Sequence, residues 1–209
     1  MNGVSELPPV RSTAMERLLL REFSHRTNNE LASAIGLISV AASRCGNDDA
    51  RIALTAVLDR LQSYAQVHHS LELPEHSTTI DLTAYILQLC RAISHSKLEN
   101  NGIALSLSLY PIRMSSERSW LLGMIVFELI TNAARHAFGD GGGAIHLDLL
   151  PAGAFIECCI RDNGTSDPNP SPGMGLAIVE ALAANLDGTV DMQFGPDGTR
   201  TSVNFPYLS

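Results

Sequence analysis

The chain has 209 residues, of which 45% are hydrophobic and 17% charged, and its formal net charge is -8. This apolar content excludes wholesale disorder, and the length fits one large domain or two small ones. An acidic chain without a Lys/Arg cluster is a poor candidate for binding nucleic acid or an anionic membrane.

The chain also lacks the marks of a membrane or secreted protein. No apolar run reaches the roughly 18 residues of a membrane span, and the N-terminus has no signal-peptide pattern. The four cysteines have no metal spacing, so we expect reduced, buried thiols. These observations predict a cytoplasmic protein with no membrane span.

The first part of the chain predicts two long helices. Apolar residues recur at helical spacing from Thr13 to Cys45, and Gly46 supplies a stop. A second helix is expected from Asp48, a candidate N-cap, to about Leu71. Two helices joined by a short turn form an antiparallel hairpin, whose apolar stripe must pack on the rest of the chain or on a second copy. A dimeric four-helix bundle is the standard solution.

The composition changes near residues 72–80, and helices and strands alternate beyond that point. Asp81 and Ser115 or Ser116 are candidate helix caps, and residues 151–153 are a candidate hairpin turn. We predict helices over 82–96, 116–138 and 174–186, and strands over 102–110, 144–150, 154–161, 189–194 and 201–205. Helices on one face of a mixed sheet are the natural layering, and the whole chain is then of the α+β class.

His25 is the first candidate for chemistry, in a helix beside Arg26, Asn28 and Asn29. A neutral imidazole is a good nucleophile near pH 7, because its pKa lies close by. The amide of Asn29, one turn further on, reaches the same space. The same pattern also fits a solvated helix face that happens to include a histidine, so both interpretations stay open.

A second group is Glu128, Asn132 and His136, which recur every four residues and so share one face of a predicted helix, next to Arg135. An Asn carbonyl oxygen suits a hard cation such as Mg²⁺, which typically keeps several waters and takes further oxygens from phosphates. Arg135 and His136 are suited to phosphate charge. The alternative is an amphipathic helix with a narrow polar stripe.

A third group surrounds a loop between a strand and a helix. Asp162 and Gly164 follow the strand, and Gly173 and Gly175 open the helix. Glycines before a helix N-terminus let backbone N–H groups approach an anion, although a turn explains them equally well. Asp162 suits an exocyclic amine or a turn. Thr199 lies in the last hairpin, which alone indicates only a turn.

Together, the order and spacing of these segments resemble the transmitter module of a two-component sensor histidine kinase. The H-box of the HWE-like sub-family is matched by FSHRTNNEL and the N-box by FELITNAARHAF. The G1, G2 and G3 boxes are matched by DNG, GMGLAIVEALA and DGTRTSVNFP, and LDRLQSYAQVHHSL resembles the second helix of the dimerisation hairpin. The resemblance implies an N-terminal tail over 1–12, a dimerisation and phosphoacceptor hairpin over 13–73, and a GHKL-type ATP-binding α/β sandwich over 80–209.

The resemblance also assigns roles to residues. His25 would be the phosphoacceptor, with Asn29 beside it, and Glu128 a base or water-orienting group. Asn132 would bind Mg²⁺, and Asp162 the adenine amine. The residues that would hold ATP are Asn132, Arg135, His136, Asp162, Gly164, Gly173, Gly175 and Thr199. The chain departs from the family in Asn28, where a Lys is common, in a short lid over 165–172 with three prolines, and in lacking a clear F-box.

Two functions follow from this resemblance. The first is a soluble histidine kinase that autophosphorylates His25 with ATP and Mg²⁺ and transfers the phosphoryl group to an aspartate of a response-regulator receiver, working as a homodimer through the hairpin. The alternative is a histidine phosphotransfer relay with a degenerate ATP-binding domain, which shuttles phosphate between receivers. A GHKL protein-serine kinase is a weaker third reading, because such kinases need no phosphoacceptor hairpin.

Overall fold

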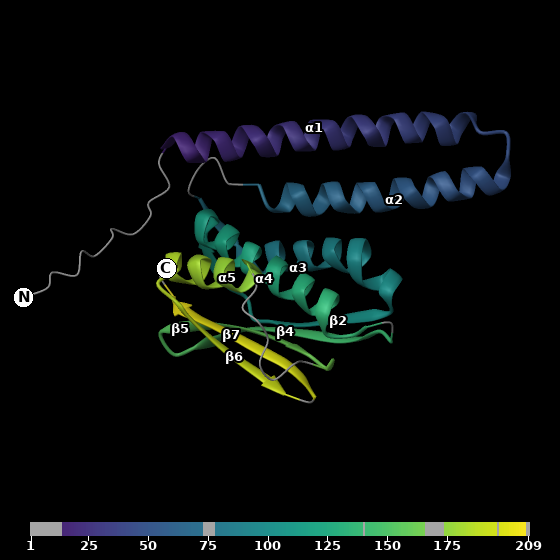
Figure 1. The fold of residues 1–209 in the computed structure, drawn as a ribbon. Helices are drawn as coiled ribbons and strands as arrows, with labels where there is room; N and C mark the ends of the chain where they lie inside the picture. Colours follow the sequence, from purple (N-terminus) through teal and green to yellow (C-terminus); the bar gives the residue numbers. More distant parts are fainter. Residues whose placement is uncertain (1–13, 73–77, 140, 166–173, 196, 208–209) are drawn as a thin grey trace, which may run out of the picture.

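The computed structural model describes residues 14–72, 78–139, 141–165, 174–195 and 197–207. Two long antiparallel helices, α1 and α2, lie over a layer formed by α3, α4 and α5, and this layer covers one face of a sheet (Figure 1). The arrangement confirms the predicted α+β class, with a helical N-terminal part before a mixed α/β domain. Among the described residues, no helix combines the length and apolar character that a membrane crossing requires.

The hairpin consists of α1 (Ala14–Arg44) and α2 (Asp48–Ser70). The predicted N-cap of α2, Asp48, is wrong: the cap is Asn47, whose extended backbone lets its side chain accept from the Ala50 N–H at 3.0 Å. Asp48 is instead the first helical residue, where its carboxylate interacts favourably with the helix dipole and pairs with Arg51 at 2.7 Å.

Helix α3 (Leu82–Ile93) begins at the predicted cap, since the Asp81 carboxylate accepts from the Ala84 N–H at 2.9 Å. The helix stops earlier than predicted: residues Ser94–Leu98 form a π-helical turn and Glu99–Asn101 a 3₁₀ turn. The wider turn buries the side chains of Ser96 and Leu98, and Gly102 then ends the segment with a φ of 65°.

Helix α4 (Ser116–His136) begins at Ser115, which accepts from the Arg118 N–H. Before it, the short strands β1 (Thr79–Asp81) and β3 (Arg113–Ser115) pair antiparallel. Neither was predicted, because three residues are too few for an alternating pattern to stand out. Helix α5 (Met174–Asn185) completes the layer.

The main sheet has five strands in the order β2-β4-β5-β7-β6, with β2 parallel to β4 and the other neighbours antiparallel. The strand over 154–161 begins one residue later than predicted, because the turn lies at Gly153, with a φ of 66°, and Ala154 rather than at 151–153. The strands are β2 (Ile103–Leu109), β4 (Gly143–Ala152), β5 (Phe155–Asp162), β6 (Thr189–Gly195) and β7 (Gly198–Pro206).

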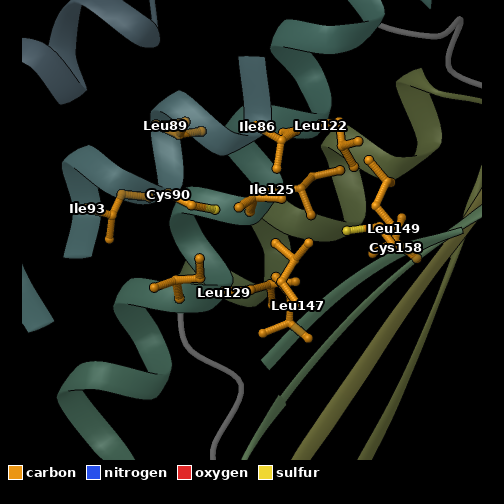
Figure 2. Close-up of a cluster of buried hydrophobic side chains, with 14 of the residues drawn as sticks. Ile86, Leu89, Cys90, Ile93, Leu122, Ile125, Leu129, Leu147, Leu149 and Cys158 are labelled. Atoms are coloured by element: carbon orange, nitrogen blue, oxygen red, sulfur yellow. The ribbon is translucent and has the colours of Figure 1, made fainter. Parts of the chain in front are cut away.

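The core lies between this sheet and the helices above it, as Figure 2 shows for side chains of α3, α4, β4 and β5. Cys90 and Cys158 belong to this core, and burial raises the pKa of the Cys90 thiol to about 12. All four cysteines are free, and three of them are buried, in line with the prediction of reduced thiols.

The end of α2 is fastened to the α/β domain by two side chains, which we call the Tyr85–Trp120 clasp. The Tyr85 hydroxyl, from α3, donates to the Ser70 carbonyl at 2.9 Å, and the Trp120 Nε1, from α4, donates to the Leu71 carbonyl at 2.7 Å. Carbonyls at a helix C-terminus lack partners within the helix, so the clasp satisfies groups that α2 cannot satisfy itself. Val67, 3% exposed, packs into the core beside it.

Candidate functional site

Glu128 and Asn132 lie together on the face of α4 that meets the first turn of α5. Leu129 and Ile130, between them in the sequence, are buried in the core and fix the rotation of the helix. A Cβ placed on Gly175 would lie 2.8 Å from Asn132 Nδ2 and 3.3 Å from Glu128 Oε2. The glycine therefore allows the backbone of α5 to approach both polar side chains closely.

The carboxylate of Asp162, at the end of β5, is contacted by two other predicted site residues. Its Oδ1 accepts from the backbone N–H of Gly164 at 3.0 Å and from that of Thr199 at 3.2 Å. Its Oδ2 has no hydrogen-bond partner in the described part of the chain. Three predicted site residues from two separate segments thus meet at one carboxylate, which keeps one oxygen free to accept from a ligand.

Gly198 makes this meeting possible and was not among the predicted site residues. Its φ of 121° is one that L side chains rarely adopt, and a Cβ there would collide with the carbonyl oxygen of Asp162. The dipeptide Asp197-Gly198 between two strands was a sequence signal for such a turn. Beside it opens a cavity of about 360 Å³, whose lining includes Asp162, Thr199, Phe194, Arg161 and Arg200.

His25 lies exposed on α1, and its ring forms no hydrogen bond with the described residues. The neighbouring Arg26 pairs with Glu22 at 2.8 Å, and Asn29 is also exposed. Asn28 instead turns toward α2, where its amide donates to Glu72. The imidazole of His25 is therefore accessible from solvent.

The structure does not bring all the predicted residues into one place. His25 is on α1, whereas Glu128 and Asn132 are on α4 in the layer on the other side of α2 (Figure 1). His136 is exposed at the end of α4, and no described residue bonds to its ring. Gly173 and most of the predicted lid over 165–172 lie outside the described residues.

Arg135 points to a second cavity, of about 410 Å³, between α2 and the α/β domain. Arg60 of α2 and Lys97 of the π-helical turn line the same cavity. Neither was predicted as a site residue, since each stands alone in the sequence and only the tertiary fold brings the three cations together.

Two family models match successive parts of the chain. Residues 22–97 match the family described as "Histidine kinase", and residues 103–205 match the "Histidine kinase-like ATPase domain". The first match covers the hairpin with His25 and also α3, and the second covers the sheet with α4 and α5. Together they leave only short stretches of the chain unmatched.

The curated relatives that the chain resembles are also histidine kinases. The chain is 27% identical to the blue-light-activated histidine kinase 2 of Erythrobacter litoralis over 98% of its own length, and 26% identical to the sensor histidine kinase PdtaS of Mycolicibacterium smegmatis over 86%. It spans 61% of the length of the first relative and 37% of the second.

Solved structures share the fold. The histidine kinase domain from the Erythrobacter litoralis EL346 blue-light-activated histidine kinase aligns with a TM-score of 0.59 at 19% identity, over 86% of this chain and 96% of that one. The Acinetobacter baumannii histidine kinase AdeS aligns with a TM-score of 0.54 at 16% identity, over 88% of this chain and 97% of that one. At these identities, the likeness establishes the arrangement of helices and sheet.

Proposed function

Because the chain belongs to the histidine kinases, with the helical domain before the ATPase domain, we propose that it autophosphorylates His25 from ATP and passes the phosphoryl group to an aspartate of a response-regulator receiver. One observation carries the proposal: the Asp162 carboxylate, with its free Oδ2, lines a cavity of about 360 Å³, and the polar residues of α4 lie against the first turn of α5. His25, on the hairpin, is exposed and unengaged.

The residues present fit ATP and Mg²⁺. The free Oδ2 of Asp162 is an acceptor for an exocyclic amine, and Thr199 lies beside it. Asn132 and Glu128 offer the oxygen ligands that Mg²⁺ prefers, and both lie beside the backbone of Gly175 in the first turn of α5. Gly164, Gly173, Arg135 and His136 complete the proposed nucleotide set. Mg²⁺, when bound, would neutralise phosphate charge.

In phosphoryl transfer, the protein mainly positions the nucleophile and the phosphates and stabilises their charge. A ring nitrogen of His25 attacks the γ-phosphorus in line, the bond from that phosphorus to the β–γ bridging oxygen breaks, and ADP leaves. The proton of the attacking imidazole passes to Glu128 or to water, and Asn29 lies one helical turn from the ring. Since α1 and α4 lie on opposite sides of α2, the transfer requires the hairpin and the ATPase domain to rearrange, or a second copy to supply one of them.

A homodimer through the hairpin accounts for its exposed apolar residues. Leu37 and Ile52 are 71% and 67% exposed, and Val40 and Val57 are 48% and 46% exposed. Apolar side chains gathered on one hairpin favour association with a second copy into a four-helix bundle. The free cysteines agree with a cytoplasmic setting, where thiols stay reduced.

Incubation with γ-labelled ATP and Mg²⁺ tests the proposal. The full chain should acquire an acid-labile label that His25→Ala abolishes, whereas His68→Ala, which removes an exposed histidine of α2, should keep it. The label would then move to a purified receiver domain. A label that persists in His25→Ala refutes the assignment.

The relay function predicts different results. In that case calorimetry finds no nucleotide binding, ATP does not label the chain, and His25 acquires phosphate from a phosphorylated receiver. Nucleotide binding with self-labelling selects the kinase.

A further inference from the structure

The charged side chains that line the cavity between α2 and the α/β domain are all cationic. Arg60, Lys97 and Arg135 line it, each from a different element, and its lining includes no acidic side chain. None of the three has an ion-pair partner within the described residues. Arg60 and Arg135 are exposed and Lys97 is half-buried, and three unpaired cations around one cavity are an arrangement that an anion would stabilise.

Aromatic rings, and no paired carboxylate among the described residues, lie next to the ammonium group of Lys97. Its Nζ lies 5.0 Å from the ring centre of Phe127 and 6.0 Å from that of Tyr64, so aromatic faces take the place of a carboxylate. Burial lowers the pKa of Lys97, and the neighbouring Arg135 cation lowers it further, while Glu128, outside the lining, raises it.

The remaining lining suits a phosphate group. Asn100 and Asn101 offer amides beside the cations, and the volume of about 410 Å³ is within the range of small-molecule sites. The hydroxyls of Ser96 and Thr131 also line the cavity but already donate to backbone carbonyls, so the cations and amides would hold the anion. Guanidinium groups bind phosphate oxygens through two parallel hydrogen bonds, and an ammonium group binds them as a point charge.

We propose that this cavity, which we call the α2 cleft, binds a phosphate-bearing anion between Arg60 of the hairpin and Lys97 and Arg135 of the α/β domain. The anion bridges the two domains and so stabilises the arrangement in which α2 rests on the α3–α4 layer. Its phosphate groups belong to a phosphorylated small molecule separate from the nucleotide that Asn132 and Asp162 would hold. The site does not depend on phosphorylation of His25.

Pyrophosphate is the probe, titrated by calorimetry into the full chain. Arg60→Gln and Lys97→Gln should each weaken its binding at least tenfold, and Arg91→Gln, which removes an exposed arginine of α3 outside the cleft, should leave it unchanged. Circular dichroism of each variant confirms that the fold is retained. Equal pyrophosphate affinities for Arg60→Gln and Arg91→Gln overturn the proposal.

The source of the phosphate is decided by adding nucleotide. If a separate ligand occupies the cleft, pyrophosphate still binds to the protein saturated with ADP and Mg²⁺, and Arg60→Gln still weakens it. If Arg60→Gln weakens ATP more than ADP and leaves pyrophosphate binding unchanged, the cleft holds only the nucleotide's own phosphates and the proposal is overturned. Failure of His25 labelling does not change the pyrophosphate result, so the proposed kinase function and the cleft fail independently.

Discussion

The glycine that opens α5 provides the sharpest test of the candidate site. In Gly175→Ala, the new methyl group would lie 2.8 Å from Asn132 Nδ2, so the amide must move by several tenths of an ångström. Mg²⁺ demands near-ideal geometry at about 2.0–2.1 Å from its ligands, and misplacement by about 1 Å costs on the order of 10²-fold. We therefore expect a 10- to 100-fold loss of Mg²⁺-ATP affinity, or about 1.4–2.7 kcal/mol.

The fold should not suffer, because alanine is a better helix former than glycine by up to about 1 kcal/mol. Gly36→Ala is the matched control: Gly36 lies inside α1, and a Cβ there meets nothing within 4 Å. We expect this variant to gain stability in urea unfolding and to bind nucleotide normally. If calorimetry finds that Gly175→Ala binds Mg²⁺-ATP as tightly as Gly36→Ala does, the placement of the metal at Asn132 is wrong.

Three further predictions concern the Asp162 carboxylate, the Tyr85–Trp120 clasp and the buried thiols. Asp162→Asn keeps one oxygen for the N–H groups of Gly164 and Thr199 but loses the charge, so nucleotide affinity should fall at least tenfold with the melting temperature nearly unchanged; unaltered calorimetric affinity would count against this role. Trp120→Phe deletes the donor to the Leu71 carbonyl and should lower the free energy of unfolding by about 1 kcal/mol in urea, whereas an unchanged value would make the clasp energetically irrelevant. Above pH ~8.5 the unfolded Cys90 thiol ionises while the folded thiol, with a pKa of about 12, keeps its proton, so the stability it contributes, complete below pH ~8.5, should fall by about 1.4 kcal/mol per pH unit. Burial also raises the pKa of Cys158, which adds a slope of its own, so Cys90→Ala should reduce the total slope without removing it, and an equal slope in that variant contradicts the prediction.

Local sequence patterns predicted most of the fold, because helix and strand periods are set by neighbours along the chain. The stripe of α1 and the alternation of β2 needed no distant contact. The cap of α2 was misplaced by one residue, since Asn47 and Asp48 are equally good N-caps by residue type and only the backbone conformation chooses between them. The π-helical turn after α3 depends on burying Leu98, which the helical period alone does not encode.

Some residues of the candidate site were predicted from the sequence, and others were recognised only in the structure. Asp162 and Asn132 were found because the resemblance places them in ordered boxes, and the structure adds the glycine backbone against which each lies. Gly198 needed the positive φ of the last hairpin to be recognised. Arg60 and Lys97 carry no sequence signal, because their shared cavity arises only when α2 packs on the turn after α3.

Helix α2 connects these features, since it carries Arg60 in the cleft and ends in the Tyr85–Trp120 clasp, and α1 with His25 packs on it. Any movement of α2 over the α/β domain thus moves His25 relative to Asn132. An anion that bridges Arg60 and Lys97 should hold α2 in place and change the environment of the clasp. Trp120 is the single tryptophan of the chain, so its emission reports on the clasp alone.

We expect pyrophosphate to shift the emission of Trp120 with the same half-saturation as the calorimetric titration, because the indole donates to the last turn of α2. Arg60→Gln should abolish the shift, and Arg91→Gln should keep it. Pyrophosphate that binds through Arg60 and leaves the emission unchanged would separate the cleft from the clasp. The position of His25 would then be governed by the clasp and by the Asn28–Glu72 contact between α1 and the end of α2.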